Sequence, residues 1–370
     1  MSSKEGPSSM SHQETLDTVV IGGGQAGLAA GYWLARQGGS FVILDDNART
    51  GDSWRRRWDS LRLFTPSQFD SLPGLPFRSP PNDYPAKDEV AAYLEDYADH
   101  FKLPVKHNIR VTELSSDGQG YRVTADGATF IAQHVIVAAG PYQKPHVPVV
   151  AKQTPPDLFQ LHSSSYRNPA QIPVGALLVV GAGNSGAEIA LELARVGKRV
   201  WLAGRDVGRI PTNTPLGRVL GKPFDGQLVW WMMTHLLTLN TPIGRRMQAS
   251  LVQHGAPLGS LRRQELAQAG VVLAPRLAGF RAGRAVLEDG SVVDADGVIW
   301  ATGFEPDFGW IDLPIFDAQG FPDHVRGAAR SAPGLYFLGL VFQTGLSSSL
   351  LGGVGRDAAH LLRQISLDGH

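Results

Sequence analysis

The chain has 370 residues, a length that fits two domains better than one. Its 34 basic and 34 acidic side chains cancel, so no basic surplus points to nucleic acid as a partner. A hydrophobic share of 43% supplies material for buried cores and argues against a disordered chain. Cysteine is absent, which excludes disulfides, thiolate zinc sites, cysteine-ligated iron–sulfur clusters and CxxC redox chemistry.

The start of the chain and one apolar stretch indicate whether the protein is secreted or inserted into a membrane. Residues 1–15 are polar and lack the apolar run of a secretory signal, so we expect a disordered tail. The most apolar later stretch, 228–239 (LVWWMMTHLLTL), is shorter than the roughly twenty residues that cross a bilayer. We expect a buried or lid helix there, with membrane contact as the alternative. A cytoplasmic protein without a transmembrane segment is the simplest prediction.

The first of two glycine-rich units occupies residues 19–45 (VVIGGGQAGLAAGYWLARQGGSFVILD). A β-branched strand runs into G-x-G-x-x-G, an Ala/Leu-rich helix follows, and a second strand completes the dinucleotide-binding fingerprint. The glycines permit a tight turn, close approach to a pyrophosphate and close helix packing, and the helix start offers free N–H groups. This unit therefore predicts nucleotide contacts from Gly22, Gly24, Gln25, Ala26 and Gly27.

The second unit, residues 178–204 (LVVGAGNSGAEIALELARVGKRVWLAG), repeats the pattern and predicts contacts from Gly181, Gly183, Asn184, Ser185 and Gly186. The two units differ at their last strand. The first ends in Asp45, a carboxylate that can accept hydrogen bonds from a free ribose, as in FAD or NAD. The second ends in Gly204 followed by Arg205, which suits the 2′-phosphate of NADPH. Arg205 as a solvated surface charge is the alternative.

Each unit is followed by a predicted hairpin and closing strand. Residues 121–140 turn at Asp126-Gly127, and residues 285–303 turn at Asp289-Gly290. Strands that alternate with helices predict parallel sheets covered by helices on both faces. The fold class is therefore α/β with two Rossmann-like dinucleotide-binding domains.

With these features the chain resembles flavoproteins of glutathione-reductase-like architecture, and more narrowly the flavin-containing monooxygenases, including short bacterial and YUCCA-like members. The likeness covers nearly the whole chain and includes Ala301-Thr302-Gly303-Phe304 and the segment GLYFLGL…LGGVGRDA. It implies FAD in the first domain and NADPH in the second. It also implies further cofactor contacts from Asp45, Asp46, Ser53, Trp54, Arg62, Ala139, Gly140, Ala301, Thr302 and Gly303. For Trp54 the alternative is ordinary packing, and for Arg62 it is pairing with an acid.

The chain departs from the family signature F-x-G-x-x-x-H-x-x-x-(F/Y/W). His162 and Tyr166 keep its second half, whereas Pro156 and Leu158 replace the phenylalanine and glycine. His162 as a hinge or surface residue remains open, and no residue is assigned a catalytic role. The 11 histidines show neither HxxxH nor HExxH spacing, so we expect no metal.

The resemblance implies that NADPH reduces the flavin, that O2 forms a flavin C4a-(hydro)peroxide, and that one oxygen enters a small organic substrate at a nitrogen, sulfur or carbonyl centre. An NADPH-dependent flavin reductase or dehydrogenase, or a non-enzymatic FAD-binding sensor, are the alternatives. We expect the substrate to bind where the domains meet, near Phe342 and Gln343, with residues 230–239 covering the site. The alternative is that these residues belong to the core. Besides the substrate and O2, a homodimer partner is considered.

Chain order predicts the domain boundaries. Residues 16–150 and 301–370 would form a discontinuous FAD-binding domain, because the C-terminal part must return to complete the first sheet. The Pro-rich residues 151–172 would form a linker, and residues 173–300 the NADPH-binding domain.

Overall fold

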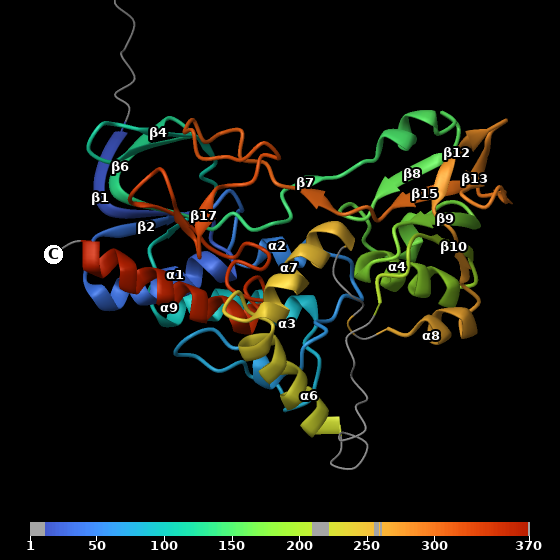
Figure 1. The fold of residues 1–370 in the computed structure, drawn as a ribbon, viewed down its shortest axis with the longest axis horizontal. Coiled ribbons are helices and arrows are strands. Elements are labelled where there is room, and N and C mark those ends of the chain that lie inside the picture. Colours follow the sequence, from blue (N-terminus) through green and yellow to red (C-terminus); the bar gives the residue numbers. More distant parts are fainter. Residues whose placement is uncertain (1–11, 209–221, 255–258, 260, 369–370) are drawn as a thin grey trace, which may run out of the picture.

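A computed structural model describes residues 12–208, 222–254, 259 and 261–368. It contains two α/β units joined by a two-stranded ribbon of β7 (Lys144–Pro145) and β16 (Phe304–Glu305) (Figure 1). The expected α/β class with two parallel sheets is confirmed.

The first unit is built on a nine-stranded sheet whose centre is parallel. The parallel strands lie in the order β3 (Val105–Lys106), β2 (Phe41–Leu44), β1 (His12–Ile21), β6 (Ala128–Val137) and β19 (Leu335–Phe337). Antiparallel additions are β4 (Val111–Ser116), β5 (Tyr121–Ala125), β17 (His324–Val325) and β18 (Ala328–Ala329). Strand β19 comes from the C-terminal part of the chain, which thus contributes to this sheet.

The second unit repeats the five-stranded parallel order. Its strands are β11 (Val272–Ala274), β10 (Arg199–Ala203), β9 (Ala176–Val180), β15 (Gly297–Trp300) and β8 (Phe159–His162). A small antiparallel sheet, β12 (Leu277–Arg281), β13 (Arg284–Leu287) and β14 (Val292–Val293), covers one face. The two hairpins predicted at Asp126-Gly127 and Asp289-Gly290 are present as β5–β6 and β13–β14.

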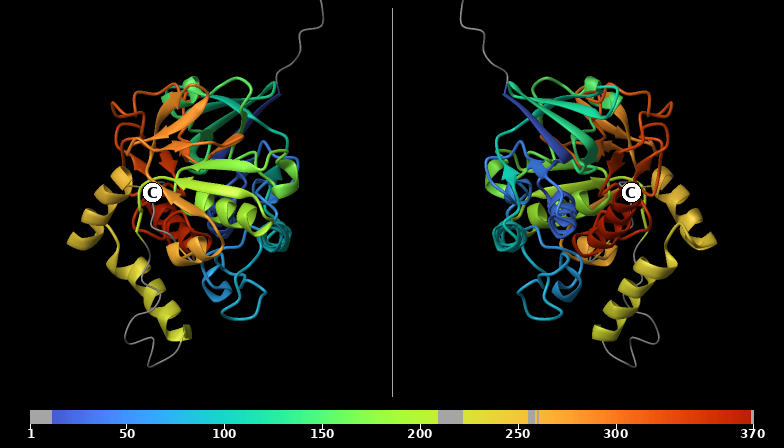
Figure 2. Two further views of the ribbon diagram at one scale, coloured as in Figure 1. Left: turned by 90° about the vertical axis from the view of Figure 1, so that its right-hand side faces the viewer. Right: turned by 90° about the vertical axis from the view of Figure 1, so that its left-hand side faces the viewer.

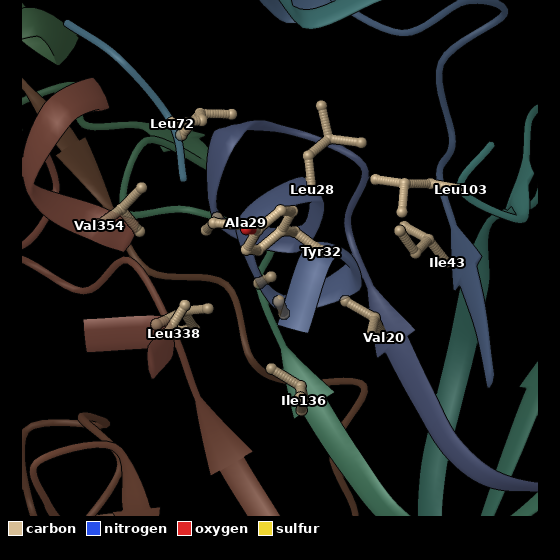
Figure 3. Close-up of a cluster of buried hydrophobic side chains, with 14 of the residues drawn as sticks. Val20, Leu28, Ala29, Tyr32, Ile43, Leu72, Leu103, Ile136, Leu338 and Val354 are labelled. Atoms are coloured by element: carbon tan, nitrogen blue, oxygen red, sulfur yellow. The ribbon is translucent and has the colours of Figure 1, made fainter. Parts of the chain in front are cut away.

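The central strands of both sheets are buried on both faces. Val20, Ile43 and Ile136 point to the side covered by α1 (Gln25–Gln37), α3 (Lys87–His100) and α9 (Leu351–Asp368) (Figure 3). Their neighbours Val19 and Val135 point to the opposite side, where β4, β5 and residues 308–316 pack. In the second sheet α4 (Asn184–Arg195) and α8 (Arg263–Gln268) cover one face. This alternation is the period-two pattern of a strand.

The apolar stretch 228–239 is helical as far as Leu236, through the end of α6 (Lys222–Trp231) and the π-helical turn η4 (Met232–Leu236). Thr238 then forms an isolated β-bridge with Gly345. With α7 (Pro242–His254) these elements form an arm that projects from the body (Figure 2). Trp230 stacks on Phe69 at 5.2 Å between ring centroids, Met233 is buried, and Trp231 is 53% exposed. No described helix is both long and apolar enough to cross a membrane.

Two boundaries differ from the sequence-based expectations. Strand β1 begins at His12, so residues 12–15 belong to the first sheet, whereas we expected them in the tail; residues 1–11 lie outside the described part. The segment expected as a linker, 151–172, contributes β8 to the second sheet. In both places a polar or proline-rich segment forms strand because it pairs with a strand that is distant in the sequence.

Candidate functional site

The first glycine turn joins β1 to α1. Gly22 has a φ of +109°, and a Cβ at this position would lie 2.6 Å from the carbonyl oxygen of Ala138. A Cβ on Gly27 would lie 1.9 Å from the carbonyl oxygen of Gly22, so only glycine allows this packing. At Gly24, in contrast, a Cβ would meet nothing within 4 Å. The turn is therefore closed toward the sheet and open where a pyrophosphate would approach the start of α1.

The second turn has the same geometry. Gly181 also has a φ of +109°, and its Cβ would lie 2.2 Å from the carbonyl oxygen of Ala301. A Cβ on Gly186 would lie 1.8 Å from Gly181, whereas the space at Gly183 is again open. Gly24 and Gly183 serve as N-caps of α1 and α4 without a side-chain capping bond, and neither first turn carries an acidic residue. Both helix starts thus suit an anionic phosphate group.

The two units differ at the carboxyl ends of their second strands, β2 and β10. Asp45 is 5% exposed; its Oδ2 atom accepts a hydrogen bond from the Gly23 backbone N–H at 2.5 Å, and its Oδ1 atom accepts one from the Asn47 backbone N–H at 2.7 Å. This fixed carboxylate retains lone pairs for a ribose hydroxyl. At the equivalent Gly204, a Cβ would lie 2.7 Å from the backbone nitrogen of Ala182, so this end has no room for a side chain.

Two arginines lie beside that glycine. Arg205 is exposed, and Arg263 on α8 reaches Asp206 at 3.4 Å. A small pocket opens among Ala182, Gly204 and Arg263. The sequence motif identified Arg205, but it could not identify Arg263, because only the packing of α8 beside β10 and β11 brings that residue to the strand end.

The further cofactor contacts predicted in the first unit, namely Asp46, Ser53, Trp54 and Arg62, fall into two groups. Trp54, on α2 (Asp52–Arg55), donates from Nε1 to Gln25 Oε1 at 3.3 Å, which places it over the start of α1. Ser53 and Asp46 are exposed near the same turn. Arg62 donates to the carbonyl oxygen of Tyr84 at 2.8 Å, and among the described residues no acid pairs with it. Its contact with the flavin pyrophosphate stays a prediction.

The two units meet through the segments that follow the closing strands β6 and β15. The side chain of Gln143 donates to the carbonyl oxygen of Gly140 at 2.8 Å. On the other side Thr302 Oγ1 donates to the carbonyl oxygen of His146 at 2.5 Å, and the His146 backbone N–H donates to Gly303 at 3.0 Å. Ala139, Gly140, Ala301, Thr302 and Gly303 therefore lie where the units join, beside the two turns.

A cationic and aromatic cluster lies at this junction. The Arg57 guanidinium lies 5.8 Å from the ring centroid of Tyr142 and 5.9 Å from that of Phe304. The His162 ring lies 5.5 Å from Phe304, and burial lowers the pKa of His162, which favours the neutral imidazole. His162 and Phe304 belong to sequence motifs of the family, whereas Arg57 and Tyr142 come from other segments and carry no motif of their own.

Three predicted residues lie in the core. Tyr166 is fully buried, and its hydroxyl donates to Glu192 on α4 at 2.7 Å, so it holds the second unit together. Phe342 and Gln343 are 2% and 1% exposed, and the Gln343 side chain donates to the carbonyl oxygens of Phe337 and Arg326. For these two residues the structure matches the core alternative to a substrate contact.

Two Rossmann-like units with different strand ends are typical of a flavoprotein oxidoreductase that binds two dinucleotides. The sequence model of the pyridine nucleotide-disulphide oxidoreductase family matches residues 19–217, and the chain belongs to this family. An uncharacterized CzcO-like oxidoreductase of Geobacillus kaustophilus is 41% identical, over 95% of this chain and 99% of its own length. A flavin-containing monooxygenase from Stenotrophomonas maltophilia is 32% identical, with a TM-score of 0.77 over 96% of this chain and 100% of its own.

A probable indole-3-pyruvate monooxygenase of Arabidopsis thaliana, YUCCA9, is 26% identical over 94% of this chain and 88% of its own. The resemblance to flavin-containing and YUCCA-like monooxygenases is thereby confirmed, and with it the assignment as an oxidoreductase whose family uses FAD and NADPH. Disulfide chemistry on the protein's own thiols is excluded, because the chain has no cysteine.

Proposed function

We propose that the protein is an FAD-dependent monooxygenase that takes its electrons from NADPH and transfers one atom of O2 to a nitrogen, sulfur or carbonyl centre of a small substrate. The observation that carries the cofactor part of this proposal is the contrast between the two strand ends, and the similarity to flavin-containing monooxygenases supports oxygen transfer. One backbone geometry occurs twice, with a buried carboxylate at Asp45 and with a side-chain-free end beside Arg205 and Arg263. This pair of ends suits one cofactor with a free ribose and one with a 2′-phosphate.

The chain's own residues would act by binding and placement. The open turn at Gly24 would receive the FAD pyrophosphate, and Asp45 would accept a bond from its ribose. The turn at Gly183 would receive the pyrophosphate of NADPH, with the 2′-phosphate toward Arg205. The flavin, once bound, supplies the redox chemistry.

The junction between the units would hold the reacting groups. Arg57 contributes a positive charge there, whereas His162 contributes none near neutral pH because burial lowers its pKa. Tyr142, Phe304 and Arg57 would pack around the bound rings and limit the access of water. No acid–base residue is assigned, since placement and exclusion of water are the tasks that this cluster supports.

The cofactor assignment is tested by the ratio of kcat/KM for NADPH to that for NADH. Arg205→Ala should lower this ratio about tenfold or more, because a charge-assisted contact to the 2′-phosphate is lost. Arg199→Ala is the matched control, since it removes the same charge from the opposite end of β10. An unchanged ratio in Arg205→Ala would refute the assignment.

Oxygen transfer is tested by rapid mixing and product analysis. The NADPH-reduced protein is mixed with O2 beside a sulfide, an amine, a ketone and indole-3-pyruvate, the last taken from the name of the Arabidopsis relative. A monooxygenase yields an oxygenated product in step with NADPH consumption. Immediate reoxidation with hydrogen peroxide as the sole product for every substrate would favour the alternative, a flavin reductase without oxygen transfer.

A further inference from the structure

A cavity of about 340 Å³ lies apart from both glycine turns, between α9, the turn that joins β17 to β18, and the arm at η4. Its size falls within the range of small-molecule sites, which runs from about 300 to 1,000 Å³. Arg326 comes from the turn, Arg356, His360 and Arg363 from α9, and His235 from η4. None of the nucleotide-binding predictions involves these residues.

The wall of this cavity is strongly cationic. Among the described residues, none of Arg326, Arg356 and Arg363 has a carboxylate within 4 Å. The acidic residue recorded in the wall is Asp357, which is 2% exposed and accepts a hydrogen bond from the Thr344 hydroxyl at 2.5 Å. Three guanidinium groups against one carboxylate leave a net charge of +2 with neutral histidines.

The position of these residues on α9 keeps them out of the core. Val354, Ala358 and Leu361 are buried in the cluster that packs on α1, whereas Arg356, His360 and Arg363 follow at i, i+4 and i+7 on the opposite side of the helix. On this stripe Arg356 and Arg363 are exposed and His360 is partly buried, and together with the arm and the β17–β18 turn they line the open cavity.

The wall also ties the arm to the first unit. Arg356 donates to the carbonyl oxygen of Thr234, and Arg326 donates to the Asn240 side chain. Since a guanidinium carries five N–H donors, each of these arginines keeps donors for a further acceptor. Arginine in this arrangement suits the oxygens of a phosphate or carboxylate.

We propose that this cavity binds a small organic anion through its phosphate or carboxylate oxygens, and that the bound anion links η4 to α9. The site is independent of the two dinucleotide turns. Because the ligand would contact both the arm and the first unit, its binding would hold the arm against the body.

Protonation supports the same site. Burial lowers the pKa of His360, and the charges of Arg326 and Arg363 lower it further, against the opposing effect of Asp357. A bound anion offsets the arginine charges, so binding and protonation of His360 favour each other. The titratable groups that face the cavity are His235, His360 and Asp357, beside the three arginines.

Calorimetric titration of the FAD-loaded protein with pyrophosphate and with citrate, each at a fixed ionic strength set with sodium chloride, tests the proposal. We expect submillimolar binding of at least one probe, weakened tenfold or more in Arg363→Gln and in Arg326→Gln. Arg330→Gln is the control: this exposed arginine is paired with Asp323 on the same turn region but does not line the cavity. Flavin absorbance confirms that each variant is folded.

The pattern of probe binding decides the outcome. Preference for pyrophosphate or for citrate identifies the ligand as phosphate- or carboxylate-bearing. The affinity of the wild-type protein for the probe should rise from pH 8 to pH 6 more steeply than the affinity of His360→Gln. Because the probe titrates in the same way in both measurements, the difference between the two proteins reports on His360. No binding of either probe, or equal weakening in Arg330→Gln, would overturn the proposal.

Discussion

The two dinucleotide units share a backbone and differ in the side chains at one strand end. Both use the same five-strand order, both begin their turn with a glycine at φ +109°, and both leave the middle glycine open. At the strand end the first unit has Asp45 bonded to Gly23, and the second has Gly204 against Ala182. This comparison supports the proposal that the glycine turn receives the pyrophosphate, which all dinucleotides share, and that the strand end selects between the cofactors.

The units also differ in the origin of their fifth strand. In the second sheet β8 precedes the unit directly, whereas in the first sheet β19 arrives only after the whole second unit has been made. The first unit is therefore completed by chain that returns across the molecule, together with α9, which packs on α1. This return also brings α9 and the β17–β18 turn to the arm, where the cationic cavity lies.

The largest predicted effect comes from replacing the first glycine of each turn, because the two replacements should affect different cofactors. Gly22→Val places a branched side chain at a positive φ against the Ala138 carbonyl, so FAD binding should be lost and the protein should purify colourless. Gly181→Val introduces the same strain in the second turn, so it should keep its flavin and lose reduction by NADPH. Visible absorbance and anaerobic reduction measure both effects. Loss of flavin in Gly181→Val but not in Gly22→Val would reverse the assignment of the turns.

The second prediction concerns the helices behind the turns. Ala29 in α1 is fully buried, and the aligned position in α4 is Glu188, whose pKa burial and then Glu192 raise to about 7. Between pH 4.5 and 7 the folded protein thus binds more protons than the unfolded chain, so stability falls as pH rises through this range. Glu188→Gln should therefore stabilise the protein by about 2 kcal/mol at pH 8 and little at pH 4.5.

Thermal unfolding at the two pH values measures this difference. Glu288→Gln is the control, because this exposed glutamate of the same unit lies in the β13–β14 hairpin region. An equal stabilisation by Glu188→Gln at both pH values would show that its protonation is not responsible.

The third prediction converts one strand end into the other. Gly204→Asp alone should weaken both nicotinamide cofactors, since its Cβ would lie 2.7 Å from the backbone nitrogen and 2.9 Å from the Cβ of Ala182. Ala182→Gly/Gly204→Asp removes the Cβ contact, leaves only a small backbone shift to be made, and recreates the Gly23–Asp45 pair with a carboxylate where a 2′-phosphate would bind. The NADPH-to-NADH ratio of kcat/KM should then fall about tenfold or more. A double variant that keeps its NADPH preference would show that the strand end does not select the cofactor.

Local patterns explain which parts of this molecule were predictable. The glycine turns and both hairpins follow from short sequence motifs, because nearest neighbours determine such geometry. Arg263 and Arg57 could not be found in this way, since each is brought to its place by packing between distant segments. The strand from His12 was hidden because its first residues are polar and gain their order from pairing with β6.

The smallest predicted effects concern the first residue of each helix. Gln25 accepts a bond from Trp54, and the aligned Asn184 accepts one from the Gly259 backbone N–H at 2.8 Å. In each unit an amide side chain thus ties a neighbouring segment to the start of the helix. Gln25→Ala should weaken FAD binding, and Asn184→Ala NADPH binding, each by about two- to tenfold, the range expected for one neutral hydrogen bond. Flavin release and the KM for NADPH measure the two effects, and if either variant shifted both cofactors equally, the two segments would not act separately.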